Sequence, residues 1–228
     1  MVYVGLDYGA SQCAVAAATP EGVLPIPLDA GQPYLLSCLY ALDRSLISDR
    51  VAQSLQGAEQ QTFAQKRQAL LTLAARSKRE QQIQSSADAI SFGAEALEQH
   101  IADPAEGYFI KSPKSFLGAS GLRADMVDFF EDVVTAMMLE IKRRTEEHLQ
   151  QSVAGVVIGR PVNFQGIDAE ASNRQAQAIL LTSAQRAGFH HVEFLYEPLA
   201  AGFDFERRLE TNQKVLVVDI GGGTSDCS

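Results

Sequence analysis

The stretch Val2-Tyr-Val-Gly-Leu-Asp-Tyr-Gly-Ala-Ser11 opens the chain, and a stretch of the same kind, Val215-Leu-Val-Val-Asp-Ile-Gly-Gly-Gly-Thr-Ser-Asp226, closes it. Each begins with an apolar run typical of a buried strand, ends that run on an aspartate, and continues into a glycine turn with hydroxyl side chains. Glycine lets backbone N–H groups approach a phosphate, and an aspartate can hold Mg²⁺ through water. The pair of motifs therefore predicts a phosphate-binding cleft with one wall built on each motif.

Either motif alone has an ordinary structural explanation. The glycine triplet at 221–223 could be a flexible turn, and Asp7 could simply end a strand as a turn residue. Phosphoryl transfer requires backbone donors around the phosphate, carboxylates near a metal ion and a group that positions the attacking water. The two motifs together supply the first two requirements, so the prediction of a site depends on their pairing.

The composition is that of an acidic globular protein. The 228 residues have a net charge of −9, are 46% hydrophobic and contain no long Lys/Arg cluster, which argues against nucleic-acid and anionic-membrane partners. The three cysteines, Cys13, Cys38 and Cys227, lack the spacing of a metal site or a disulfide framework. The first basic residue is Arg44, and no apolar run reaches the roughly 20 residues of a membrane span. We therefore expect a cytoplasmic protein.

Hydrophobic patterning predicts strands at the start of the chain and an insertion after them. Short apolar runs separated by Gly and Pro predict a strand meander in the first 42 residues, with the last strand over 35–42. Residues 49–89 are rich in Gln, Lys, Arg and Ala, and their apolar residues recur at helical spacing. They predict two mostly solvated helices. Residues 103–121 form a loop-rich stretch that contains Lys111 and Lys114.

Strands and helices alternate in the remainder of the chain. A long helix over 122–149 is followed by strands over 153–158, 192–196 and 215–220, with helices over 171–187 and 198–209 between them. This alternation is typical of an α/β domain with parallel strands and crossover helices.

Five motifs, taken in order, resemble one protein family. Besides the two glycine motifs they are Lys114-Ser-Phe-Leu-Gly118, Ile158-Gly-Arg-Pro-Val-Asn-Phe164 and Tyr196-Glu-Pro-Leu-Ala-Ala-Gly202. Their order is similar to that in the nucleotide-binding domain of the heat-shock-seventy (DnaK-like) chaperones, within the actin, sugar-kinase and chaperone superfamily. The stretches 111–121 and 215–228 most resemble the divergent YegD-like bacterial homologues. The resemblance spans nearly the whole chain.

The resemblance implies an α/β fold of the actin-like ATPase (ribonuclease H-like) type. Residues 1–42 and 120–210 would form the core of lobe I, residues 43–119 an inserted helical subdomain, and residues 211–228 the start of lobe II. The short segment after Gly118 implies that the insertion is reduced, and the chain would be an N-terminal fragment of the family's domain. The implied cofactors are ATP or ADP with Mg²⁺, and the implied partners are client proteins or co-chaperones.

The resemblance also assigns roles to individual residues. The positions that match catalytic residues are Lys114, Glu197, Asp219 and Thr224, with Lys114 beside the γ-phosphate and the attacking water. The positions that match nucleotide contacts are Asp7, Gly9, Ala10, Ser11, Gly221, Gly222, Gly223 and Thr224. Asp7 and Asp219 would hold hydrated Mg²⁺, with Asp226 nearby. Pro161 and Arg174 match a proline switch and a relay arginine, and Lys111 is a weaker candidate than Lys114.

Simpler structural explanations remain open for these residues. Lys114 could be a solvated surface lysine, and Glu197 a first-turn carboxylate near the positive end of a helix dipole. Pro161 could be a strand terminator and Arg174 an exposed helix residue. Ala10 stands where the chaperones usually carry a phosphate-contacting threonine. The missing hydrogen bond, on the order of 1.5–3 kcal/mol when one partner is charged, implies a weak ATPase.

Three functions fit the sequence. The first is an ATP-binding, weakly hydrolysing chaperone-like protein, which the five ordered motifs favour. The second is a metabolite or sugar kinase of the same superfamily, which would need a general-base aspartate at the acceptor, whereas Lys114 and Glu197 suit attack by water. The third is a nucleotide-sensing interaction module that does not hydrolyse ATP, which Ala10 favours.

Overall fold

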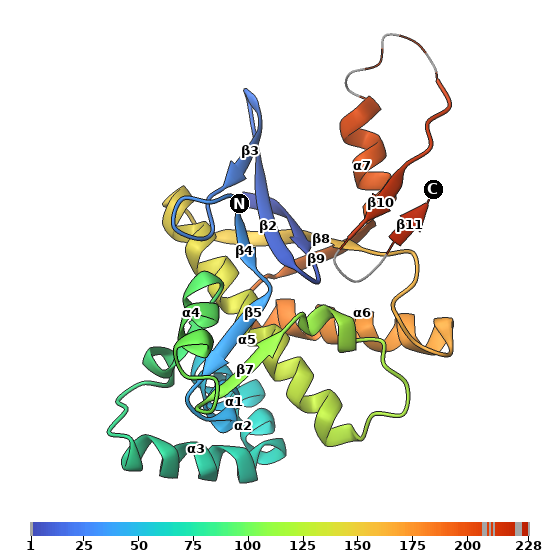
Figure 1. Ribbon diagram of the computed structural model, residues 1–228. Coiled ribbons are helices and arrows are strands. Elements are labelled where there is room, and N and C mark those ends of the chain that lie inside the picture. Colours follow the sequence, from blue (N-terminus) through green and yellow to red (C-terminus); the bar gives the residue numbers. More distant parts are fainter. Residues whose placement is uncertain (1, 207–208, 210, 212, 222–224, 228) are drawn as a thin grey trace.

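A mixed β-sheet forms the centre of the computed structural model, which describes residues 2–206, 209, 211, 213–221 and 225–227 (Figure 1). The strand order is β3-β2-β1-β8-β9, and β4 pairs with β2 outside this path. The strands are β1 (Val2–Tyr8), β2 (Gln12–Thr19), β3 (Gly22–Ile26), β4 (Tyr34–Leu36), β8 (Val153–Arg160) and β9 (His191–Tyr196). The predicted N-terminal meander and the predicted α/β class are both confirmed.

The parallel part of this sheet decides where a site can form. β1 runs antiparallel to β2 but parallel to β8, and β8 runs parallel to β9. The helix α6 (Ala169–Arg186) connects β8 to β9, as the strand–helix alternation predicts. The carboxyl ends of β1, β8 and β9 therefore meet at one edge of the sheet, where ligands of open α/β sheets usually bind.

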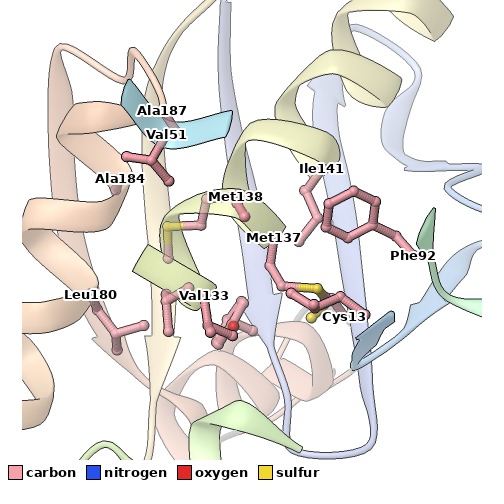
Figure 2. Packing of buried hydrophobic residues seen from close by; sticks show 14 of the residues in the cluster. Cys13, Val51, Phe92, Val133, Met137, Met138, Ile141, Leu180, Ala184 and Ala187 are labelled. Atoms are coloured by element: carbon pink, nitrogen blue, oxygen red, sulfur yellow. The ribbon is translucent and has the colours of Figure 1, made fainter. Parts of the chain in front are cut away.

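One face of the sheet carries the core. Val4, Leu6 and Tyr8 alternate with exposed residues along β1 and are 4%, 2% and 0% exposed, as the two-residue period of a strand requires. This face packs against α6 and the long helix α5 (Ala124–Leu149), which contributes Met137 and Met138 (Figure 2). Figure 1 shows both helices on the same side of the sheet.

A second, smaller sheet lies beside the first. Its order is β6-β5-β7, formed by β5 (Cys38–Ala41), β6 (Ile90–Phe92) and β7 (Tyr108–Lys111), with α4 (Ala94–Ala102) packed against all three strands. The prediction of a single strand over 35–42 is wrong, because Ser37 separates β4 in the large sheet from β5 in the small one. The stretch 103–121 is less irregular than predicted, since it holds β7 and the 3₁₀ helix η2 (Pro113–Phe116).

The insertion between β5 and α5 is only partly helical. Three helices follow β5, namely α1 (Arg44–Ser54), α2 (Gly57–Lys66) and α3 (Gln68–Glu80), and then the short helix η1 (Ser86–Ala89). The prediction of mostly solvated helices over 49–89 is confirmed for α2 and α3, in which only Phe63, Ala74 and Ser77 are buried. The predicted number of two is wrong, because the end of α1, where Val51 is fully buried, and the short helix η1 also lie in this range. β6 and β7 also lie within 43–119, so this segment is mixed α/β, and its limits as a domain stay a prediction.

A buried ion pair joins the insertion to α5. Arg67 lies at the junction of α2 and α3, and its side chain is 3% exposed. Its Nε is 2.8 Å from Oδ2 of Asp132, which is fully buried. Arg67 also contacts Asp128 at 2.8 Å, and the Ser48 hydroxyl donates to Asp132 at 2.6 Å. Burial raises the pKa of Asp132, although the hydrogen bonds from Arg67 and Ser48 oppose this shift. The charge of Asp132 therefore depends on these partners.

A second ion cluster on α5 gives the fold a pH dependence. Glu140 lies 3.1 Å from Arg50, 2.7 Å from Arg143 and 2.8 Å from Arg144. Burial raises the pKa of Glu140, but the hydrogen bonds from Arg143 and Arg144 outweigh burial and lower that pKa from 4.5 to about 2. A depressed pKa in the folded state means that Glu140 contributes stability above pH 4.5 and loses it as the pH falls toward 2.

We expect Glu140→Gln to lower the free energy of unfolding at pH 7 by about 2–3 kcal/mol, because an ionised and well-paired carboxylate is lost. The variant should also show a flatter decline of stability between pH 4.5 and 2. Urea unfolding at a series of pH values measures both effects. Glu147→Gln is the matched control, since Glu147 also pairs with Arg143 but is 68% exposed. Equal pH profiles for the two variants would contradict this account.

The last elements are α7 (Glu197–Glu206) and the antiparallel pair β10 (Val218–Ile220) and β11 (Ser225–Cys227). The strand predicted over 215–220 is confirmed in part, since it begins at Val218. Across the described ranges, no helix has both the length and the apolar character that a membrane crossing requires.

Candidate functional site

The candidate site lies at the carboxyl ends of the parallel strands. Asp7 is the penultimate residue of β1, Gly159 is the penultimate residue of β8, and Glu197 begins α7 directly after β9. These three residues and Gln12 help to line one cavity of about 710 Å³. A Cβ on Gly159 would lie 3.3 Å from Cγ of Glu197, so glycine leaves room for this side chain. The topology thus brings together residues that are about 190 positions apart in the chain.

Lys114, which is buried, and Glu197, which is partly buried, form an ion pair. Nζ of Lys114 lies 2.6 Å from Oε1 of Glu197, and the two side chains are 8% and 16% exposed. Lys114 is held in η2, which begins at Pro113 after Ser112 adopts a left-handed conformation with φ 55° and ψ 52°. Lys111, in contrast, is exposed on β7. The structure therefore excludes a solvated Lys114 and supports its preference over Lys111, while its catalytic role stays a prediction.

The turn between β1 and β2 is a tight one in which the backbone passes close to Gly9. A Cβ on Gly9 would lie 2.3 Å from the carbonyl oxygen of Gln12, a contact that real side chains do not make. Glycine is therefore required at this position by the close approach of the backbone. Ala10 and Ser11 complete the turn, and Ser11 is exposed.

Ser37 holds this turn through two hydrogen bonds, and its role was not predicted from the sequence. Its hydroxyl donates to the carbonyl oxygen of Gly9 at 2.7 Å, and its backbone N–H donates to the carbonyl oxygen of Ser11 at 2.9 Å. A serine between two apolar runs belongs to no motif that the sequence analysis used. The break it makes in an apolar stretch is the one signal that could have identified it.

The buried thiol of Cys13, which follows the turn, has a pKa that depends on the charges of Asp7 and Lys114. Sγ of Cys13 lies 3.2 Å from Oγ of Ser37. Burial raises the pKa of the Cys13 thiol to about 12; the Ser37 hydrogen bond lowers it, the Asp7 charge raises it and the Lys114 charge lowers it. The charges of Asp7 and Lys114 therefore shift this pKa in opposite directions, and Cys13 stays a neutral thiol at physiological pH.

The second glycine motif is described only in part. The backbone of β10 and β11 places Asp219 opposite Asp226 in the ladder. The side chains of Asp219 and Asp226 lie outside the described residues, as do Gly222, Gly223 and Thr224, while Gly221 follows β10. Among the side chains that are described, no group of three or more His, Cys, Asp or Glu residues could hold a metal ion. The proposed metal set of Asp7, Asp219 and Asp226 therefore stays a prediction.

Pro161 and Arg174 occupy different surroundings. Pro161 is buried directly after β8, whereas Arg174 is 66% exposed on α6 and pairs with Glu170. Arg160, which the sequence analysis did not select, lies over the ring of Tyr196 at 5.0 Å and donates to Gln177 at 2.7 Å. Arg160 therefore links the end of β8 to the residue before Glu197 and to α6.

A comparison with protein families matches residues 115–228, which are 114 of the 228 residues, to the family model described as Hsp70 protein. The chain belongs to the Hsp70 family. Its mixed sheet and packed helices are those of an actin-like ATPase lobe. The family match identifies this lobe as part of a chaperone-type nucleotide-binding domain.

Curated relatives point to the same family. The chain is 31% identical over 163 residues to the protein named Chaperone protein HscA homolog of Acinetobacter baumannii (strain SDF), which covers 60% of this chain and 25% of that relative. A protein of the same name from Acinetobacter baylyi is 34% identical over 101 residues, or 42% of this chain and 15% of the relative. The chain thus matches a quarter or less of the length of these relatives.

Proposed function

We propose that this Hsp70-family domain binds ATP with Mg²⁺ and hydrolyses it slowly. The observation that carries the proposal is the Lys114–Glu197 ion pair at 2.6 Å, with Glu197 lining the same cavity as Asp7. A lysine and a glutamate held in this way suit the attack of water on a phosphoryl group, because one neutralises charge and the other orients the water.

Each group of site residues would have a distinct role in this reaction. The backbone N–H groups of the Gly9–Ser11 turn would bind phosphate oxygens, and the ammonium of Lys114 would lie by the γ-phosphate. Glu197 would keep Lys114 in place and accept a hydrogen bond from the attacking water. From the second motif, Asp219 and Asp226 would approach the metal, and Gly221, Gly222, Gly223 and Thr224 would contact the phosphates.

Carboxylate oxygens are suitable ligands for Mg²⁺, and Asp7 at the cavity wall fits this chemistry. Bound Mg²⁺ would neutralise charge on the phosphates. Ala10 leaves the turn without one hydroxyl, so we propose that hydrolysis is slow. The same residue favours the alternative of a nucleotide-sensing module that binds ATP without cleaving it.

Further parts of the proposal follow from the sequence alone. Client proteins or co-chaperones are the proposed partners, the cytoplasm is the proposed location, and the YegD-like homologues are the proposed branch, on the stretch 111–121. Pro161 and Arg174 are proposed to transmit the nucleotide state to such partners. The exposed position of Arg174 would let a partner reach it.

Phosphate release from ATP by the full-length protein tests the proposed function. We expect slow release that requires Mg²⁺ and does not require an added acceptor, because Lys114 and Glu197 suit water as the nucleophile. Parallel reactions with sugars and small alcohols provide the comparison. Release that occurs only with an acceptor would identify a kinase, and MgATP binding without release would identify the sensing module.

A further inference from the structure

Ser37 lies where the chain passes from the large sheet into the small one. It follows β4, which pairs with β2, and precedes β5, which pairs with β6 and β7. The residue is 2% exposed, so its polar groups must find partners within the protein.

Those partners lie on both sides of the candidate site. Toward the large sheet, the Ser37 hydroxyl donates to the carbonyl oxygen of Gly9 at 2.7 Å, and the Ser37 N–H donates to that of Ser11 at 2.9 Å. Toward the small sheet, the Ser37 carbonyl oxygen accepts the N–H of Ser112 at 2.8 Å. One buried residue therefore contacts the Gly9–Ser11 turn and the segment that carries Lys114.

The contact with Ser112 fixes the start of η2. Ser112 has a φ of 55°, which is uncommon for a residue other than glycine, so this conformation needs support from its surroundings. Its N–H is held by Ser37, and its carbonyl oxygen accepts the N–H of Ser115 at 3.0 Å. Lys114 lies inside this turn and reaches Glu197 at 2.6 Å.

We propose that Ser37 is a positioning residue that holds the Gly9–Ser11 turn and Lys114 in a single arrangement for the triphosphate of the nucleotide. The inference rests on the proposed function and adds a residue that acts through others. Without the hydroxyl, the Gly9 carbonyl oxygen loses a hydrogen bond from a buried donor, so the Gly9 end of the turn is less firmly held relative to the Lys114 segment, although the backbone hydrogen bonds of Ser37 to Ser11 and Ser112 remain. Phosphate contacts should then weaken together with hydrolysis.

Nucleotide binding by the full-length protein separates this role from general destabilisation. We expect Ser37→Ala to weaken MgATP binding by about tenfold and to lower kcat, while adenosine binding stays unchanged, because only phosphate contacts depend on the turn. Ser37→Thr keeps the hydroxyl and should restore MgATP affinity. Ser91→Ala is the matched control, since Ser91 is also buried and donates to Gln99 at 2.7 Å from β6 of the same small sheet. Unchanged MgATP affinity and kcat in Ser37→Ala would overturn the proposal.

Hydrogen exchange without nucleotide tests the same link even if the proposed function fails. Amides in residues 9–12 should exchange faster in Ser37→Ala than in the wild type and in Ser91→Ala, whereas amides in residues 112–117 should change less, because the backbone hydrogen bond from Ser112 to Ser37 remains. If the wild type does not bind MgATP, the proposed function is wrong, and exchange still decides whether the Ser37 hydroxyl holds the turn. Unchanged exchange in residues 9–12 would overturn the positioning role of Ser37.

Discussion

Replacing Lys114 with alanine is expected to lower kcat for ATP hydrolysis by on the order of 10²–10³, with MgATP still able to bind. The substitution removes the charge closest to the reacting end of the nucleotide in the proposed arrangement. It also leaves Glu197, whose side chain is 16% exposed, without its cationic partner. Single-turnover hydrolysis in the full-length protein, with affinity measured separately, distinguishes a loss of chemistry from a loss of binding.

The chain offers a matched control for this experiment. Lys111 is three positions before Lys114 and carries the same charge, but it is exposed on β7. Lys111→Ala should therefore change kcat by less than about twofold, as expected for a solvated charge. An equal loss of kcat in the two variants would contradict a specific role for the Lys114–Glu197 ion pair, because it would show that any positive charge in this region has the same effect.

Replacing Asp132 with alanine is expected to lower the free energy of unfolding by about 3–5 kcal/mol, because it leaves the buried Arg67 guanidinium without its main partner. Arg67 is 3% exposed and Asp132 is fully buried, so water cannot replace the lost contact without a rearrangement. Urea unfolding followed by circular dichroism measures the loss. A loss of this size would report mainly the cost of leaving the buried Arg67 charge without its main partner, and not the net contribution of the intact pair.

An exposed pair and a double variant test this explanation. Glu80→Ala breaks the Arg76–Glu80 pair, whose side chains are 70% and 59% exposed, and should cost less than about 1 kcal/mol. Arg67→Met combined with Asp132→Ala removes both charges and should recover part of the loss. A double variant less stable than Asp132→Ala would contradict an unpaired charge as the cause.

Much of the large sheet could be predicted from the sequence because its signals are local. Apolar runs bounded by glycine predict β1, β2 and β3, and the strand–helix alternation predicts α5, β8, α6 and β9 in order. The small sheet could not be predicted in the same way. One serine, Ser37, interrupts the apolar run over 35–42, and a single polar residue does not show that the two halves pair with strands of different sheets.

Long-range polar contacts were the other limit of prediction. Arg67 lies in a segment whose composition indicates solvated helices, yet its side chain is buried, because it forms an ion pair with Asp132 on α5. Nothing near Arg67 in the sequence identifies a partner 65 residues away. The contacts of Ser37 are mostly to backbone atoms, which leave no pattern in the sequence of the residues they reach.

Residues of the candidate site could be predicted where they belong to a sequence motif. Asp7, Lys114 and Glu197 belong to motifs that resemble a known family, and the structure places the latter two in contact. Arg160 was not selected from the sequence, although it lies over the ring of Tyr196, the residue before Glu197. Its contacts arise where the ends of β8 and β9 meet, which the sequence alone does not show.

Calorimetric titration of the full-length protein with ATP in the presence and absence of Mg²⁺ tests the central claim most directly. The cavity at Asp7 and Glu197 predicts saturable binding of one ATP per chain, tighter with Mg²⁺ than without it. Adenosine should bind more weakly than MgATP, because the described turn and Lys114 act on phosphates. Absence of binding, or equal affinity for adenosine and MgATP, would contradict a phosphate site at these residues.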